Sequence, residues 1–153
     1  MDIPEPARLA LGDASASTAA ERPAFALLTV DDDGFPHVCL LAAQQLDLHD
    51  DPGLLGVSVA GRHTAEFLRD KGKATLVVVE GTAAHYLKCE VVADVVVERR
   101  SGFTLAVRDH KADSAGVELT PITFRFSEQL AVSERWSRDR AVLRALRHTV
   151  EDD

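Results

Sequence analysis

The sequence predicts a mainly β domain, a small antiparallel barrel with one interior helix and one C-terminal helix. Seven short segments carry the alternating or continuous apolar residues of strands, and an Asp-Gly pair follows the first of them. Only two segments after residue 22 have clear helical features. A barrel of this kind joins successive strands by short turns and closes its own sheet edges. We expect residues 1–22 to form an N-terminal arm and residues 23–153 to form this single domain.

The N-terminal arm carries Pro4, Pro6 and Gly12, followed by a stretch of serine, alanine and threonine. We expect a short helix over Ala7–Leu11 and a loosely held remainder.

The first strands follow directly. Phe25–Val30 is rich in apolar and β-branched residues, and the Asp31–Gly34 segment after it favours a hairpin turn. His37–Leu48 is the predicted partner strand, and Leu54–Val59 is a third, short apolar strand. The aspartates of the turn also suggest a calcium loop, but the flanking helices and the remaining ligands of an EF-hand are missing. We interpret the segment as a solvated turn.

The interior helix is predicted over Ala65–Lys71. Thr64 is its expected N-cap, and Gly72 is placed to end it in the left-handed conformation. Thr75–Glu80 then forms a strand that is apolar on both faces.

The second half of the chain predicts three more strands. Tyr86–Val97 is long enough to require a bulge if it is to curl around a barrel. Phe103–Val107 alternates like a strand, His110–Gly116 is an expected loop, and Ile122–Phe126 is the last strand.

A C-terminal helix is predicted to begin at Ser133. Its apolar positions fall near helical spacing; they are Trp136, Val142, Leu143, Leu146 and Val150. Four arginines cover the other face; they are Arg138, Arg140, Arg144 and Arg147. These arginines form either a basic patch or a solvated helix face, and the interspersed acidic residues favour the solvated face.

Composition limits the possible partners. The net charge of -8 disfavours nucleic acid and anionic membranes. No apolar run approaches the roughly 20 residues that span a bilayer, and the N-terminus lacks the features of a secretory signal, so we expect a cytoplasmic protein. Cys39 and Cys89 are predicted to be buried thiols, and neither cysteines nor histidines have the spacing of a metal site.

The turn Gly61-Arg62-His63-Thr64 is the best candidate for a ligand site. It places a cation, an imidazole and a hydroxyl at the start of a helix, where free backbone N–H groups favour an anion. The segment therefore suits a phosphate. The alternative is that Thr64 only caps the helix and Arg62 is a solvated surface charge. Nucleophile elbows, P-loops and dinucleotide fingerprints are all missing, so redox chemistry here would require a cofactor.

The order of these segments resembles the FMN-binding split barrel of the pyridoxamine 5'-phosphate oxidase family. The similarity runs from Phe25–Val30 through Asp33–Val38, Val57-Ser58 and Arg62–Leu68 to Lys73–Leu76. It implies an antiparallel split β-barrel of Greek-key type, and it also favours a strand over a helix at Phe103–Val107.

The resemblance further implies FMN bound at the interface of a homodimer. By its motifs, Arg62 and Thr64 would hold the FMN phosphate with His63 beside them, while Val57 and Ser58 would lie along the isoalloxazine through backbone groups. Lys73 or Lys71 would add positive charge.

Two departures from the family bear on the activity. Thr64 stands where the family has a phosphate-binding lysine, and the C-terminal arginine motif of the true oxidase is missing. We therefore expect a flavin-dependent oxidoreductase of another small molecule rather than the oxidase itself. Other split barrels bind haem or deazaflavin, so a storage or sensing protein for such a ligand, or a cofactor-free dimeric barrel, stays open. Trp136 would either cover the partner subunit's flavin or attach the C-terminal helix to the barrel.

Overall fold

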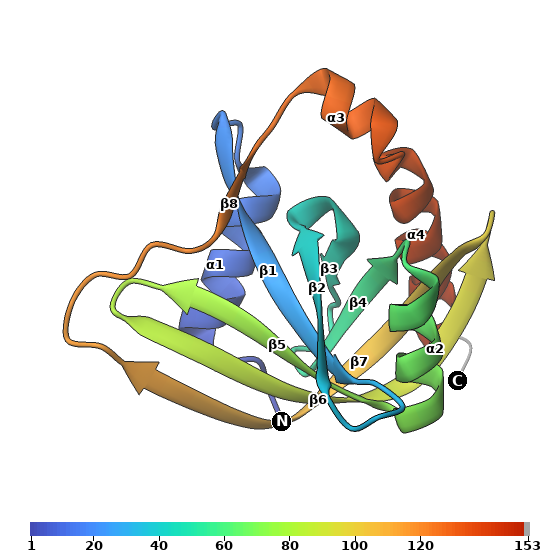
Figure 1. Cartoon of the computed structure of the whole chain (residues 1–153), viewed down its shortest axis with the longest axis horizontal. Helices are drawn as coiled ribbons and strands as arrows, with labels where there is room; N and C mark the ends of the chain where they lie inside the picture. Colours follow the sequence, from blue (N-terminus) through green and yellow to red (C-terminus); the bar gives the residue numbers. More distant parts are fainter. Residues whose placement is uncertain (152–153) are drawn as a thin grey trace.

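The computed structural model describes residues 1–151 and confirms the predicted fold class, a curved antiparallel sheet with helices at its sides (Figure 1). Within these residues eight strands form one sheet in the order β2-β1-β5-β6-β7-β4-β3, and β8 pairs with the start of β1. The strands are β1 (Glu21–Val30), β2 (Pro36–Ala42), β3 (Leu46–Leu48), β4 (Leu54–Val59), β5 (Lys73–Glu80), β6 (Ala83–Val97), β7 (Arg100–Ser114) and β8 (Thr123–Arg125). The helices are α1 (Glu5–Ala16), α2 (Arg62–Lys71), α3 (Glu128–Ser133) and α4 (Trp136–Glu151), with a 3-10 turn, η1, at Ala43–Gln45.

The hairpin between β1 and β2 forms as predicted. One carboxylate oxygen of Asp31 accepts hydrogen bonds from the backbone N–H groups of Asp33 and Phe35, at 3.0 and 2.8 Å. Gly34 adopts a φ of 86°, which glycine reaches at the lowest steric cost. The aspartate is thus used by the turn itself.

The predicted strand His37–Leu48 is wrong in its middle, because the chain turns a corner at η1. The side chain of Gln45 accepts a hydrogen bond from the Ala42 N–H at 3.0 Å and donates one to the Ser58 carbonyl at 3.3 Å. These two bonds hold the corner, so β2 and β3 pair with different strands, β1 and β4.

The long hairpin of β6 and β7 confirms one prediction and corrects another. The register of β6 shifts between Lys88 and Cys89 and again between Val91 and Ala93, so the predicted bulging is present. The expected loop His110–Gly116 is wrong, because β7 continues to Ser114 and pairs with β6 as far as Ala83. Ladder hydrogen bonds with a long partner strand override the polar composition of this segment.

The N-terminal segment is not loosely held. α1 extends from Glu5 to Ala16 rather than over Ala7–Leu11, and Ile3, Ala7, Leu11 and Ala14 join the main hydrophobic core. The N–H of Ile3 also donates to the Pro52 carbonyl at 2.8 Å. The apolar spacing of the helix, rather than its prolines, decides how this segment packs.

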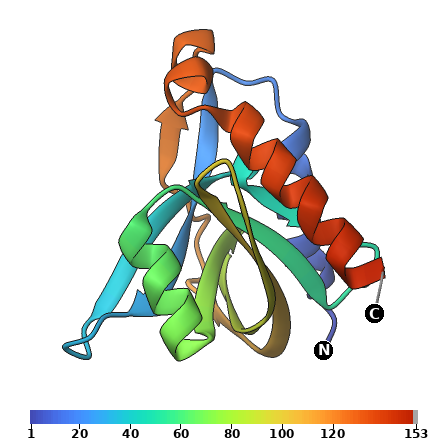
Figure 2. The same cartoon turned by 90° about the vertical axis from the view of Figure 1, so that its right-hand side faces the viewer.

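The predicted C-terminal helix begins at Trp136 rather than at Ser133, and a separate short helix, α3, precedes it. Between the two helices Arg135 has a left-handed φ of 56°. α4 packs along β4, β6 and β7 (Figure 2). Val142 lies against Gly102, and any side chain at position 102 would collide with it. Trp136 stacks on Phe126 at 6.0 Å, which attaches the start of α4 to the end of β8.

The two cysteines differ in burial. Cys89 is buried and Cys39 is half-buried, and both are free thiols. Among residues 1–151 there is no helix that is both long and apolar enough to cross a membrane.

Candidate functional site

α2 follows β4 and precedes β5 in the chain, and the capping of its N-terminus differs from the prediction. The helix begins at Arg62, its N-cap is Gly61, and no side chain caps it. The first backbone hydrogen bond of the helix runs from the Ala65 N–H to the Gly61 carbonyl, at 3.2 Å. Thr64 is therefore not the N-cap as predicted. The N–H groups of the first turn have no side-chain acceptor in this structure and are suited to an external anion.

The Thr64 hydroxyl has a different partner. Thr64 is buried, and its Oγ1 lies 3.0 Å from Nε2 of His37 on β2. The His37 ring meets the edge of Phe67 at 5.1 Å. The Thr64 side chain thus joins α2 to β2. Thr64 cannot be the N-cap, because the helix already begins at Arg62 and Thr64 lies within its first turn. Its backbone N–H still faces the helix start.

Arg62 and His63 are both at the surface beside one carboxylate. The Arg62 side chain is 83 % exposed and its Nε lies 3.2 Å from Glu66, while His63 Nδ1 lies 3.7 Å from the other oxygen of Glu66. An exposed pair of this kind contributes little to stability, so the guanidinium is free to exchange Glu66 for a phosphate. Of the predicted residues, Arg62, His63 and Thr64 are brought together here.

Val57 and Ser58 lie in β4 with buried side chains. The Ser58 hydroxyl donates to Oδ1 of Asp139 at 2.6 Å, and its carbonyl accepts from Gln45. β4 also has partner strands on both sides, β3 and β7. Because of these hydrogen bonds and strand pairings, few polar groups of Val57 and Ser58 are available to a ligand within one subunit.

Lys73 is distant from Arg62. It is exposed at the first residue of β5, after the C-terminal end of α2. At a rise of about 1.5 Å per residue, the helix separates the two positions by roughly 15 Å. Lys71, in the last turn of α2, is separated in the same way. Neither lysine shares a phosphate with Arg62 in the same subunit.

A buried polar cluster of Ser58, Arg100 and Asp139 was not predicted. Asp139 is fully buried, Arg100 Nη1 donates to it at 3.2 Å, and Arg100 also binds the Glu134 carbonyl. Burial raises the pKa of the Asp139 carboxyl, opposed by the hydrogen bond from Ser58 and the charge of Arg100. The sequence signal was the spacing of Asp139 from Val142, Leu143 and Leu146, which places it on the apolar stripe of α4.

No protein-family model matches this chain, and no curated protein matches its sequence. Solved structures of similar fold were found. An FMN-binding protein from Syntrophomonas wolfei subsp. wolfei has a TM-score of 0.54 at 14% identity, over 72% of this chain and 85% of its own.

Two reductases are similar to a comparable degree. An F420 reductase has a TM-score of 0.53 at 13% identity, over 71% of this chain and 98% of its own. The styrene monooxygenase flavin reductase from Pseudomonas putida S12 has a TM-score of 0.52 at 14% identity, over 61% of this chain and 83% of its own. At these identities the likeness shows a shared fold: this chain has the split-barrel fold found in flavin reductases and FMN-binding proteins.

Proposed function

We propose that this protein binds FMN, with the phosphate at the N-terminus of α2, and acts as a flavin-dependent oxidoreductase on a small molecule. The observation that carries the proposal is the uncapped first turn of α2 with Arg62 beside it. Backbone N–H groups, the helix dipole and a guanidinium together form a suitable phosphate site. The fold, shared with flavin reductases, supports the same assignment.

The residues at the N-terminus of α2 fit the phosphate of FMN better than they fit its isoalloxazine ring. Arg62 would move from Glu66 to the phosphate, the N–H groups of the first turn would donate to its oxygens, and His63 would lie beside it. The bound flavin would supply the electron transfer, and the chain would hold and orient it. The isoalloxazine contacts expected from backbone groups of Val57 and Ser58 are limited within one subunit, because β4 is paired with a strand on each side.

The missing contacts favour a site completed by a second copy of the chain. Val38 and Leu40 of the edge strand β2 are 54% and 53% exposed, although their neighbours in the strand are half-buried or buried. Phe35 in the preceding turn is 68% exposed. A continuous apolar surface on an edge strand is typical of an interface. We propose that a homodimer covers this surface.

Titration of the protein with FMN tests the proposal. Arg62→Ala should weaken FMN binding by roughly 1.5–3 kcal/mol, the value of one charge-assisted hydrogen bond. Lys73→Ala removes the same charge at the other end of α2 and serves as the matched control. Equal FMN affinity in wild type and folded Arg62→Ala would contradict the phosphate assignment.

An absorption spectrum of the purified protein distinguishes the cofactor classes. Oxidised flavin bands support FMN, a Soret band would indicate haem, and the bands of a deazaflavin would point to the chemistry of the similar F420 reductase. A colourless protein that does not bind added FMN would favour a cofactor-free barrel.

A further inference from the structure

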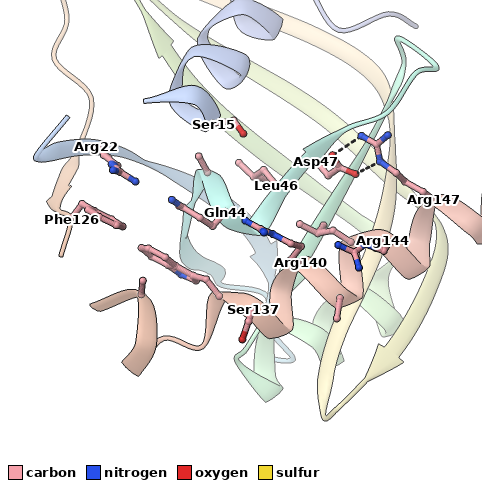
Figure 3. A pocket seen from close by; sticks show the side chains of 15 residues that line it. Ser15, Arg22, Gln44, Leu46, Asp47, Phe126, Ser137, Arg140, Arg144 and Arg147 are labelled. Carbon is pink, nitrogen blue, oxygen red and sulfur yellow. Dashed lines mark hydrogen bonds and ion pairs between the residues drawn. The ribbon is translucent and has the colours of Figure 1, made fainter. Parts of the chain in front are cut away.

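A cavity of about 750 Å³ lies beside α4 and is not part of the proposed flavin site. Its walls come from α4, η1, β3, the end of α1 and the residues around β8 (Figure 3). No residue from Val57 to Thr64 lines it, and Figure 2 shows α2 and α4 apart. Its volume is within the usual range for small-molecule sites, about 300–1,000 Å³.

The cavity is strongly basic in an acidic protein. Four arginines line it, Arg22, Arg140, Arg144 and Arg147, and Asp47 is the one acidic residue among its lining. Arg147 holds Asp47 through two hydrogen bonds of 2.6 and 2.8 Å. Four positive charges less one negative charge leave a local excess of three, in a chain whose net charge is -8. Such a local reversal favours a polyanionic ligand.

Two of these arginines are available to a ligand. Arg140 and Arg144 are exposed, and neither forms an ion pair with a side chain of residues 1–149. Figure 3 shows both extending from α4 at the cavity, beside Gln44 and Asp47 of the facing segment. Their positions are one helical turn apart, about 6 Å along the axis. Two guanidinium groups at this spacing can bind adjacent phosphates or the two sides of one.

The other end of the cavity is aromatic. Phe126 and Trp136 are stacked with an angle of 15° between their rings, and the Arg22 guanidinium lies 3.5 Å from the centre of the Phe126 ring. Trp136 is only half-buried, so part of the indole is open to the cavity. Because Arg22 and Trp136 cover the Phe126 ring, a planar base would stack on the open part of Trp136, as bases do on aromatic side chains.

We propose that this cavity binds a nucleoside diphosphate, with its base on Trp136 and its phosphates on Arg140 and Arg144. The ligand must have both a ring and phosphates, because the cavity has an aromatic end and a cationic end. The site is additional to the flavin site, since the two have no residue in common.

Trp136 allows the proposal to be tested directly, because it is the one tryptophan of the chain. Its fluorescence should change when ADP is added. Calorimetry should show that ADP binds at least about tenfold more tightly than either adenosine or inorganic pyrophosphate, each of which fills one end only. Affinity for ADP no greater than that for pyrophosphate, with no change in fluorescence, would overturn the base contact.

Variants locate the phosphates. The double variant Arg140→Ala/Arg144→Ala should weaken ADP binding about 100-fold, roughly tenfold for each charge-assisted hydrogen bond that is removed. Arg138→Ala, on the same helix but outside the cavity lining, should bind ADP like wild type. Unchanged ADP affinity in the folded double variant would overturn the proposal.

FMN also has a ring and a phosphate, so the same variants must be titrated with it. We expect FMN binding to depend on Arg62 and ADP binding on Arg140 and Arg144. If FMN binding were lost in the double variant and kept in Arg62→Ala, the cavity would be the flavin site and the nucleotide proposal would be wrong. If neither variant altered FMN binding, only the flavin assignment would fail.

Discussion

Ser58 and Asp139 are 81 residues apart in the sequence, and the Ser58 hydroxyl donates to the Asp139 carboxylate across 2.6 Å. The bond joins β4 to α4, the helix that also forms a wall of the basic cavity. Arg100 of β7 binds the same carboxylate oxygen, so one buried acidic group connects two strands and a helix. Its second oxygen, Oδ2, has no partner among the described residues. The network is thus sensitive to the loss of any one member.

Asp139→Ala should destabilise the protein by about 3–5 kcal/mol, because it leaves the Arg100 guanidinium buried without a counter-charge. Chemical denaturation measures the change. Asp109→Ala is the control, since that carboxylate is 65% exposed and pairs with Lys88 at 3.9 Å; its loss should cost less than about 1 kcal/mol. A cost for Asp139→Ala as small as that of the control would show that the network does not anchor α4.

Thr64→Val should destabilise the protein by about 1–3 kcal/mol, because it leaves the half-buried His37 ring without its hydrogen bond. The FMN affinity should change less than it does in Arg62→Ala, since the Thr64 hydroxyl is occupied and its backbone N–H is kept. Denaturation and FMN titration of the same variant provide both values. A large loss of FMN affinity at unchanged stability would instead assign the hydroxyl to the phosphate.

Leu40→Glu should shift the protein from dimer to monomer, because it places a charge on the exposed apolar surface formed by Phe35, Val38 and Leu40. Sedimentation velocity across micromolar concentrations is the appropriate measurement. Val132→Glu is the matched control, since Val132 is 76% exposed on α3, outside this surface. Dimers in both variants would place the interface elsewhere, and a monomeric wild type would exclude the dimer at these concentrations.

The sequence was most informative where local chemistry decides the structure. The strand Leu54–Val59, the Asp31–Gly34 turn and the left-handed Gly72 are all found as predicted. Each depends on apolar continuity or on the conformational preference of a single residue. The fold class follows from the sum of such signals.

The features that the sequence did not predict depend on contacts between residues far apart in the chain. Thr64 has a strong capping preference, yet His37 from a different strand takes its hydroxyl. The arginines of α4 have the pattern of a solvated face, and only the positions of η1 and α1 show that three of them line a cavity. In the sequence Asp139 interrupts the arginine face of α4, whereas in the structure its side chain is buried on the apolar side of the helix. No local rule contains this information, because it depends on how distant elements pack.

Two buried histidines should make the fold sensitive to acid. Burial lowers the pKa of His49 and of His85, chiefly because it disfavours the charged imidazolium; for His85 the neighbouring His110 acts in the same direction. The Nε2 atoms of both rings are buried without a hydrogen-bond partner among the described residues. A histidine whose pKa is depressed on folding binds its proton more readily in the unfolded chain.

The stabilising contribution of neutral His49 and His85 is fully present above the unfolded pKa of 6.5 and is lost as the pH falls through the folded pKa. Asp139 acts in the opposite sense at lower pH, since its pKa is raised from 3.8. We therefore expect the free energy of unfolding to decrease as the pH falls below about 6.5. The double variant His49→Gln/His85→Gln should show a smaller decrease, because its side chains do not titrate. An identical pH dependence in wild type and double variant would show that other groups cause the acid sensitivity.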